Sequence, residues 1–543
     1  MNQLFKVSQN YSWIEEKHGA LSISFIGRTE TIRKIIDILP KKGIPDPLQI
    51  SQCLAELPGH FAILISDGEW ALAVADKLAS YPIFYYYRPG SFQASNSARL
   101  LQNQFDLREK NTKAFIELRT ASYVTGVDTL FQNLYKLRAG ELVLWNLRTS
   151  VLTRHRYYSF FSSDIRCDSE NDLIDDLDAR TNVIIDRHIK DAGDLPIVVP
   201  LSGGLDSRTV LAKLKIRGCQ NLWAFSYGVP GNYDAKVAKY VADQIGVPWE
   251  FIPTTRDEAK KFFFSIERRN YWDYADGLHV VPNLHAFLAL KTLKDSGRFE
   301  NGAILINGQS GDFIAGDHIP QQIVRNTVSS ELLLTNIISK HYSQRRSLIL
   351  NQTIQESVRN RIKSVLEMTL ELDDSQRYAK FHELWEWQTR QSIRVLNGQR
   401  NYDYLGISWE LPLWETEYLD FWARIPLAHK LGRNLFKRWL EREDYFGLFR
   451  NYQPFMSRWP NHLIWIQHFG RGLRLFLGPK VSGNYYSLLD YFSQYSYLYA
   501  DVSYAEYLSH YNDYRGTYPH YVNVWEKENK NMFTNASNYL IQN

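Results

Sequence analysis

Short apolar runs separated by turn residues fill the first third of the chain. They lie at residues 61–66, 70–75, 83–87, 141–145 and 151–158. An Asp-Gly pair and a Pro-Gly pair stand among the residues between them. Runs of this length at this spacing are typical of consecutive antiparallel strands. We therefore predict that residues 1–160 form a mostly antiparallel β domain, with a helix near 31–38.

The pattern changes after an acidic stretch at 164–178, where apolar runs begin to alternate with segments of helical period. The predicted strands are 196–201, 221–227, 249–252 and 303–306, and the predicted helices are 207–217 and 234–245. This alternation predicts a parallel sheet covered by helices, and ligands of such sheets bind beyond the carboxyl ends of the strands. From about residue 320 the pattern is mostly helical. We predict an α/β domain with a large helical portion at 161–450 and a helical extension at 451–543.

The predicted extension is rich in aromatic residues. Of the 34 tyrosines in the chain, 12 lie between Tyr485 and Trp525. Aromatic side chains with polar tips either fill the core of the extension or form a platform for a sugar or a protein partner. Both interpretations stay open.

The composition is that of a globular protein, with 44% hydrophobic and 22% charged residues. The net charge of +4 favours neither nucleic acid nor an anionic membrane as a partner. Three cysteines, Cys53, Cys167 and Cys219, lie far apart, without the Cys/His spacing of a thiolate zinc site. The longest apolar runs are too short to span a membrane, and the N-terminus shows no signal-peptide pattern. We expect a cytoplasmic protein.

One segment carries most of the chemical information. Between the predicted strand and helix at 196–217 the sequence is Leu201-Ser202-Gly203-Gly204-Leu205-Asp206-Ser207. The glycines permit close approach of a ligand, the amide groups and helix dipole favour an anion, and Ser207 can cap the helix. We predict a phosphate or pyrophosphate pocket, in which Asp206 binds Mg²⁺. The alternative is a glycine-rich turn with a capping serine. The segment is neither a Walker A loop nor a nucleophile elbow.

This motif resembles the pyrophosphate loop of ATP pyrophosphatases, and a second segment narrows the resemblance to asparagine synthetases. Residues 304–317 again lead from a strand into a glycine-rich turn, Gly308-Gln309-Ser310-Gly311-Asp312. The resemblance implies that Asp312 supplies the second Mg²⁺ ligand and faces Asp206 across the metal. It also implies that Ser226, Tyr227 and Gly228 hold the adenine and ribose of ATP. The expected fold of this domain is then the Rossmann-like one of adenine nucleotide α-hydrolases.

The N-terminal part resembles the glutaminase domain of the same family, an Ntn-hydrolase-like fold. The resemblance is carried by segments at 59–62, 82–86, 94–95, 128–131 and 137–141, and it returns weakly at 409–415 and 425–426. Glutamine-using members expose an N-terminal cysteine, whereas position 2 here is Asn2 and Cys53 is internal, without a neighbouring base in the sequence. We therefore expect no glutaminase activity. Ammonia would come from solution or from a separate glutaminase partner, or another amine would serve.

Two further positions depart from the asparagine synthetase pattern. Gln309 replaces the family's glutamate beside the acyl-adenylate and cannot act as a base, which argues against aspartate as the substrate. The family's lysine for acyl transfer has no clean match, and the candidates are Lys437 and the segment Ser457-Arg458-Trp459. We also expect a polar segment to line the acceptor side, with an arginine that pairs with a substrate carboxylate. Its residues are Arg390, Arg394, Arg400, Asn401, Tyr402 and Tyr404.

The sequence as a whole predicts an ATP-dependent amide-forming synthetase. It would adenylate a small-molecule carboxylate, release pyrophosphate, and pass the acyl group to ammonia or an amine. The residues of these motifs resemble those of family members associated with bacterial surface polysaccharides. This resemblance implies a carboxylated sugar as the substrate. An intramolecular cyclase of the lasso-peptide or β-lactam type, an asparagine synthetase, and a non-catalytic nucleotide-binding module are the alternatives. A homodimer is a further expectation.

Overall fold

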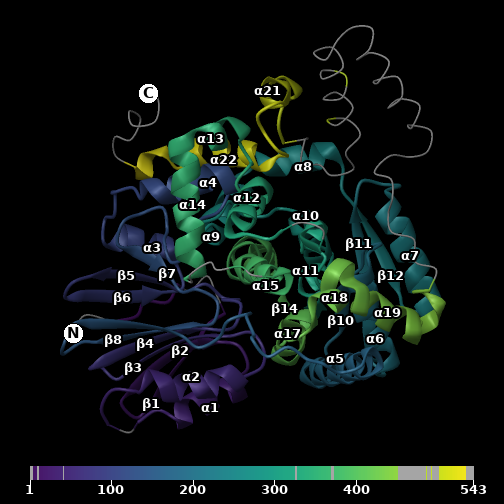
Figure 1. Cartoon of the computed structure of the whole chain (residues 1–543), viewed down its shortest axis with the longest axis horizontal. Helices are drawn as coiled ribbons and strands as arrows, with labels where there is room; N and C mark the ends of the chain where they lie inside the picture. Colours follow the sequence, from purple (N-terminus) through teal and green to yellow (C-terminus); the bar gives the residue numbers. More distant parts are fainter. Residues whose placement is uncertain are drawn as a thin grey trace.

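Two sheet systems, one antiparallel and one parallel, organise the computed structural model of the chain (Figure 1). The structure describes residues 4–8, 12–40, 42–324, 327–367, 372, 374–450, 485, 491 and 501–533. The antiparallel sheets lie in the N-terminal part and the parallel sheet follows in the chain, so the mixed α/β fold with two domains agrees with the expectation.

The N-terminal strands divide between two sheets. The larger has the order β1 (Ile14–His18), β2 (Leu21–Ile26), β3 (Ala62–Ser66), β4 (Trp70–Ala75), β8 (Glu141–Asn146) and β9 (Val151–Arg156), and all its pairs are antiparallel. The smaller has the order β6 (Ser91–Ser95), β5 (Phe84–Arg88) and β7 (Leu134–Lys136). The expected antiparallel strands are therefore confirmed. The run at 83–87 does not pair with its predecessor in the sequence, however, but begins the second sheet.

The larger sheet is covered on both faces, which explains why β3, apart from Ser66, and β4 are apolar at every position. Ile63 and Ile65 pack against helices α1 (Thr29–Asp37) and α2 (Pro47–Glu56). Leu64, on the opposite face, packs with Tyr85 of the smaller sheet. Because successive side chains of a strand point to opposite faces, a strand buried on both faces loses the usual alternation with polar residues.

The parallel sheet places the ends of two central strands side by side. Its order is β12 (Trp249–Pro253), β11 (Leu222–Gly228), β10 (Ile197–Pro200), β13 (Ile304–Ile306) and β14 (Ser408–Glu410), and every pair is parallel. The strands predicted from alternation are confirmed to within one or two residues, and β14 was not predicted. Helices α5 (Glu170–Ala192), α6 (Leu205–Ile216) and α7 (Tyr233–Ile245) connect to this sheet. Since β10 and β13 are neighbours, the loops that follow them meet at the carboxyl edge of the sheet.

A helical part fills the middle of the molecule in Figure 1. Its main helices are α12 (Ser330–His341), α14 (Gln352–Leu366), α15 (Ser375–Glu386) and α16 (Arg400–Leu405). Between α15 and α16 the chain stays helical through a π-helix at Trp387–Val395 and a 3₁₀ turn at Leu396–Gln399. The mostly helical character expected after residue 320 is confirmed for the described part of the chain.

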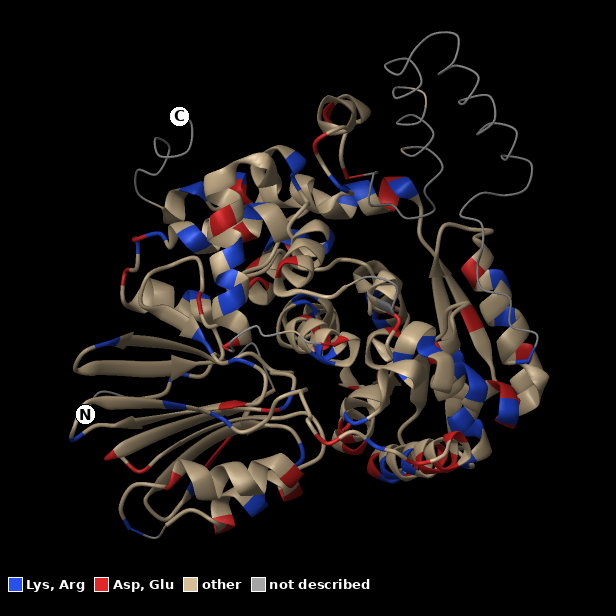
Figure 2. Ribbon diagram, viewed as in Figure 1, with Lys and Arg blue, Asp and Glu red and all other residues tan. Residues whose placement is uncertain are grey.

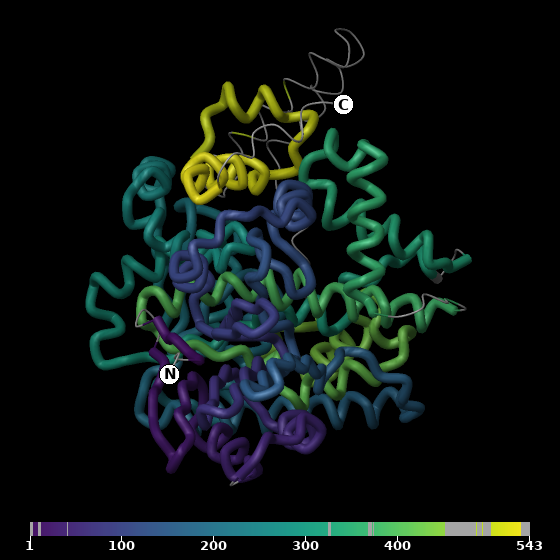
Figure 3. The backbone as a smooth tube through the Cα atoms, turned by 90° about the vertical axis from the view of Figure 1, so that its left-hand side faces the viewer, coloured from purple at the N-terminus to yellow at the C-terminus, as the bar shows by residue number. Residues whose placement is uncertain are grey.

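The described C-terminal helices pack on the rest of the protein. Helix α22 (Tyr518–Glu528) contacts α4 (Thr112–Ala121), and Figure 3 shows α21 (Tyr504–His510) and α22 above it at the top of the molecule. An ion pair and a hydrogen bond also hold α22 to helix α9 (Ile266–Ala275) and the residue that follows it. Arg268 pairs with Glu528 at 2.6 Å, and Asp276, which pairs with Arg99 at 2.5 Å, accepts from the indole of Trp525 at 2.9 Å. The aromatic Trp525 and Tyr521 are buried in the main core, which favours the core-filling interpretation for these residues.

The charged residues are spread over the surface. Figure 2 shows acidic and basic residues side by side along α5 and few charges on the antiparallel strands. Among the described residues, no helix combines the length and the apolar character that crossing a bilayer requires.

Candidate functional site

Two glycine-rich loops touch at the carboxyl edge of the parallel sheet. One leads from β10 into α6, and the other leads from β13 into α11 (Gly311–Ile314). A Cβ atom on Gly308 would lie 2.6 Å from the carbonyl carbon of Asp206 and 2.7 Å from the amide nitrogen of Ser207. A Cβ atom added to Gly311 would lie 2.7 Å from Cγ of Asp206. Both positions therefore need glycine, because the first loop occupies the space of a side chain.

The structure places the Asp206 carboxylate beside the backbone of Asp312. The carboxylate of Asp206 accepts a hydrogen bond from the backbone N–H of Asp312, and the charge of Asp312 acts on Asp206. Asp312 in turn accepts from the Phe313 amide at 2.8 Å and lies 3.4 Å from His318 Nε2. Two carboxylates on touching loops provide the oxygen ligands that a divalent cation takes.

The serines of the first loop hold its shape. The Ser202 amide donates to Ser207 Oγ at 3.1 Å, the two hydroxyls are 3.1 Å apart, and the Gly204 amide donates to Ser202 Oγ at 3.2 Å. Helix α6 begins at Leu205 with Gly204 as its N-cap and no side-chain cap. The expectation that Ser207 caps this helix is therefore wrong. Ser207 lies inside the first turn, and its hydroxyl instead accepts from the loop that precedes the helix.

The surroundings of the two loops give Asp206 and Asp312 different pKa values. Burial raises the pKa of Asp206 to about 6; the Arg433 guanidinium acts against this rise and the charge of Asp312 adds to it. Burial also acts to raise the pKa of Asp312, but the hydrogen bond and charge of His318 outweigh it and leave a pKa of about 2. At neutral pH both carboxylates are thus mostly ionised, and Asp206 carries its charge at an energetic cost that a cation would offset.

Arg433 provides the basic group that contacts the loop pair. It precedes α19 (Asn434–Glu443) in the left-handed conformation, with φ of 63°, and its guanidinium donates to the carboxylate of Asp206. Lys437, the residue predicted for this role, lies exposed on α19. The alternative segment 457–459 lies outside the described residues. No pattern in the sequence marks Arg433, because its partner is 227 positions away in the chain.

The π-helix and the turn that follows it reach the second loop. Ser310 donates to Gln391 at 2.7 Å, and the side-chain amide of Gln399 donates to Gln309. Of the predicted acceptor residues, Arg390 and Tyr402 approach this region. The Arg390 guanidinium is 3.4 Å from His318 Nδ1, and the Asn307 side-chain amide donates to the Tyr402 hydroxyl at 3.5 Å. Arg394 stacks on Tyr518 at 3.4 Å instead.

Other predicted acceptor residues are buried in the helical core. Arg400 donates to the carbonyl of Ser80 at 2.6 Å and is 3% exposed. Asn401 and Tyr402 are buried as well, and Tyr404 packs on Tyr271 and Phe287. The structure therefore does not bring the whole segment 390–404 to the loop pair.

Comparison with known proteins agrees with this geometry. The model of the family described as asparagine synthase matches residues 185–443. We refer to this matched stretch as the asparagine synthase domain. A putative glutamine-hydrolysing asparagine synthetase of Methanocaldococcus jannaschii is 26% identical over 189 residues, which are 34% of this chain and 36% of that protein. The chain thus matches about a third of the length of this relative.

Solved structures with similar segments have low overall similarity to the chain. The NH3-dependent NAD synthetase of Campylobacter jejuni, solved with a nitrate ion, is 12% identical and is covered to 99% by 36% of this chain, with a TM-score of 0.20. The glutamine phosphoribosylpyrophosphate amidotransferase of B. subtilis, complexed with ADP and GMP, is 11% identical and is covered to 74% by 46% of this chain, with a TM-score of 0.17. Such scores support no argument about fold or function.

The strand next to β10 in the asparagine synthase domain carries the predicted adenine segment. The Ser226 hydroxyl donates to the Leu201 carbonyl at 2.6 Å and accepts from the indole of Trp249 at 3.0 Å. The Ser226 side chain therefore links β11 to the first loop. The Ser226 backbone and the neighbouring residues Tyr227 and Gly228 remain the candidates for nucleotide contact. Gly228 has φ of 128°, a conformation that favours glycine.

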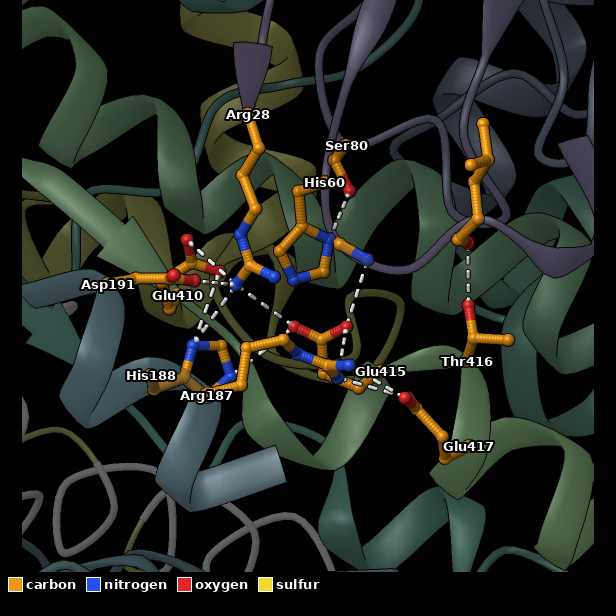
Figure 4. Close-up of polar contacts among 12 residues, drawn as sticks. Arg28, His60, Ser80, Arg187, His188, Asp191, Glu410, Glu415, Thr416 and Glu417 are labelled. Carbon is orange, nitrogen blue, oxygen red and sulfur yellow. Dashed lines mark hydrogen bonds and ion pairs between the residues drawn. The ribbon is translucent and has the colours of Figure 1, made fainter. Parts of the chain in front are cut away.

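A buried ionic cluster joins the asparagine synthase domain to the N-terminal sheets (Figure 4). Glu415 accepts from the Gly59 amide at 2.9 Å and pairs with Arg187 at 3.2 Å. Arg28 lies 3.6 Å from Glu415 and 3.7 Å from Glu410. Burial, more than any charge, raises the pKa of both glutamates. The segments 59–62 and 409–415, which the sequence linked only by family resemblance, are thus parts of one contact between domains.

The N-terminal domain shows no activated thiol among the described residues, and Asn2 lies outside them. Cys53 is half-buried on α2, and burial, followed by the charge of Glu56, raises the pKa of its thiol. A raised pKa disfavours the thiolate that a nucleophile needs. A cavity of about 60 Å³ separates this domain from the π-helix, and Asn96, Lys136, Gln388 and Ser392 are among its lining residues.

Proposed function

We propose that the protein is an ATP-dependent amide-forming synthetase. A substrate carboxylate attacks the α-phosphorus of ATP, pyrophosphate leaves, and ammonia or an amine then displaces AMP from the acyl-adenylate. The observation that supports this most is the contact between Asp206 and Asp312, at the carboxyl ends of two adjacent parallel strands. Ligands of such sheets bind at this edge, and the match to the asparagine synthase family agrees with it.

In the first step, the loop at Ser202–Ser207 binds the pyrophosphate part of ATP. Backbone amides and the start of α6 lie beside one another there, and they stabilise the charge that develops on the leaving group. Asp206 and Asp312 would hold Mg²⁺, whose chemistry is to neutralise phosphate charge. The fit rests on the two carboxylates borne by touching loops, with the Asp206 carboxylate at the Asp312 amide, and on the unfavourable ionisation of Asp206.

In the second step, Arg433 is the group that we assign to the negative charge of acyl transfer. Its guanidinium already lies at Asp206, beside the expected phosphates. Gln309 is an amide held by Gln399, so it orients a substrate by hydrogen bonds and does not remove a proton. The nucleophile must therefore arrive as a free amine or be deprotonated by another group.

We further propose the finer assignments that the sequence suggested. Residues 1–160 would be an Ntn-hydrolase-like glutaminase domain without activity, 161–450 a Rossmann-like synthetase domain, and 451–543 an extension. Ammonia would come from solution or a glutaminase partner. A carboxylated sugar is the proposed substrate, in a cytoplasmic enzyme that forms homodimers. The cyclase and asparagine synthetase alternatives differ from this only in the acyl and amine groups.

The test is pyrophosphate release with ATP, Mg²⁺ and ammonium, across a panel of uronic acids, aspartate and peptides. We expect substrate-dependent release from one class, and loss of at least about 100-fold in Asp206→Asn and Asp312→Asn. Asp317→Asn is the matched control, because Asp317 is exposed five positions from Asp312. Nucleotide binding without release from any substrate would favour the non-catalytic module. Full activity in Asp206→Asn would contradict the metal assignment.

A further inference from the structure

A second cluster of ligand-forming side chains lies behind the loop pair, in the helical part. His341 ends helix α12, and His382 and Glu386 are one turn apart on α15. Residues four apart share one face of a helix, so the two side chains of α15 both face His341. One nitrogen or oxygen atom from each of the three residues lies within 4.8 Å of the other two. All three residues are at most 5% exposed.

Of the three residues in this cluster, His382 is the one whose burial cannot be explained by packing in the core alone. It is fully buried, and neither of its ring nitrogens has a hydrogen-bond partner among the residues that the structure describes. Burying a polar group without a partner costs a few kcal/mol, about 1–3 by mutational measurements, so native proteins rarely do it. The ring lies in range of the charges of Glu386 and Lys340 and beside His341, which places it in the cluster.

His341 and Glu386 are in direct contact within this cluster. Nε2 of His341 is 2.9 Å from Oε1 of Glu386, so one nitrogen and one oxygen of the cluster already lie next to each other. An imidazole–imidazole–carboxylate set of this kind is a common zinc ligand set.

We propose that His341, His382 and Glu386 bind Zn²⁺. Three protein ligands leave a fourth position of the tetrahedron for water or another group. The other carboxylate oxygen of Glu386 lies 3.2 Å from His318 Nδ1, and His318 Nε2 lies 3.4 Å from Asp312. An outer partner of this kind orients a metal-bound carboxylate. The zinc would therefore hold the Glu386 carboxylate in place, and through it His318 and Asp312.

Two positive charges compete for Glu386. Lys340 Nζ is 2.9 Å from Oε1, and Arg390 Nη1 is 3.6 Å from Oε2. The Lys340 side chain is 34% exposed, so it can turn into solvent when the metal binds. This competition predicts that Lys340→Met binds zinc more tightly than the wild type, a gain that no purely structural role of the cluster would give.

The experiment uses the full chain, expressed with zinc, dialysed against metal-free buffer and analysed for metal content. We expect stoichiometric zinc in the wild type, a visible Co²⁺ absorption band after substitution, and loss of both in His382→Gln. Competition with a chelator should show at least about a 100-fold weaker affinity in His382→Gln, more than the 10–100-fold effect of an outer partner. Lys340→Met should show a higher affinity than the wild type.

Three controls separate this site from the others. His60→Gln alters a buried histidine of another cluster, which lies beside Glu410 and Glu415, and this variant should keep its zinc. Asp206→Asn and Asp312→Asn should also keep theirs, so the proposed nucleotide site and the zinc site can fail independently. Circular dichroism checks that His382→Gln is folded. A wild type without stoichiometric zinc and without a Co²⁺ band would overturn the proposal, as would a folded His382→Gln that keeps the metal.

Discussion

Replacing Gly308 by alanine tests whether contact between the two loops makes the nucleotide site. The added Cβ would lie 2.6–2.8 Å from three backbone atoms of Asp206 and Ser207. Ordinary contact between carbon atoms needs about 3.5–4.0 Å, so the loops must separate by roughly 1 Å. Gly308 does not have a positive φ, so alanine adds steric conflict without backbone strain. We expect a loss of stability of about 1–3 kcal/mol, the usual cost of overpacking.

The functional effect should be larger than the loss of stability. A displacement of about 1 Å in a reacting group can reduce a rate by about 100-fold. Nucleotide binding gives a second readout that needs no substrate. With ATP and Mg²⁺ at 100 times the wild-type Kd, the wild type gains about 2.7 kcal/mol, and a variant with a tenfold higher Kd gains about 1.4 kcal/mol. Melting curves with and without nucleotide measure this difference.

Gly398→Ala is the matched control, since its added Cβ would meet only Asn283 Nδ2, at 3.8 Å. This variant should keep the stability of the wild type and its response to nucleotide. If Gly308→Ala proves indistinguishable from Gly398→Ala in both readouts, the loops do not form the site by contact, and the reasoning fails.

Other predictions concern charges. Arg433→Met should lower pyrophosphate release by about 10²–10³, the cost of losing one charge-stabilising donor, whereas Lys437→Met should stay near the wild type; the reverse order would return the role to the lysine. Burial raises the pKa of Glu410 from 4.5 to about 8, so the folded state holds its proton more tightly and stability should fall as pH rises between these values. Glu410→Gln should flatten that slope in melting curves, and an unchanged slope would refute the assignment. Asp276→Ala removes the buried partner of Arg99 and should cost about 3–5 kcal/mol in urea unfolding; a loss below about 1 kcal/mol would mean that the pair behaves like an exposed one.

Most strands of the parallel sheet could be predicted from the sequence, because the period of hydrophobic residues reflects which side chains are buried. Strands β10 to β13 follow apolar runs that helical segments separate, but their order in the sheet, which sets which loops meet, is not recorded by this local pattern. Strand β14 was missed because its three residues, Ser408–Glu410, are too short to show a period. The split of the N-terminal strands into two sheets was missed for another reason. Strand pairing depends on contacts distant in sequence, which a local pattern does not record.

The candidate site was predictable where it is local in the sequence. The glycines and aspartates of the two loops lie within short motifs, and the structure brings those motifs together. Arg433 and the cluster around Glu386 were not predictable, because each joins residues from separate elements of the helical part. The π-helix was not predictable either, since its composition is that of any amphipathic helix.

That π-helix has a consequence for how the fold can change. Its residues face two ways: Gln388 and Ser392 line the cavity next to the N-terminal domain, and Gln391 contacts Ser310 in the second loop. A π-helix accommodates an extra residue in each widened turn. Deleting one residue there would tighten one widened turn toward the α-helix and shift the remaining side chains of the π-helix by one position. A single codon would thus re-aim the polar side chains between the cavity and the second loop, while the residues of both glycine-rich loops stay unchanged.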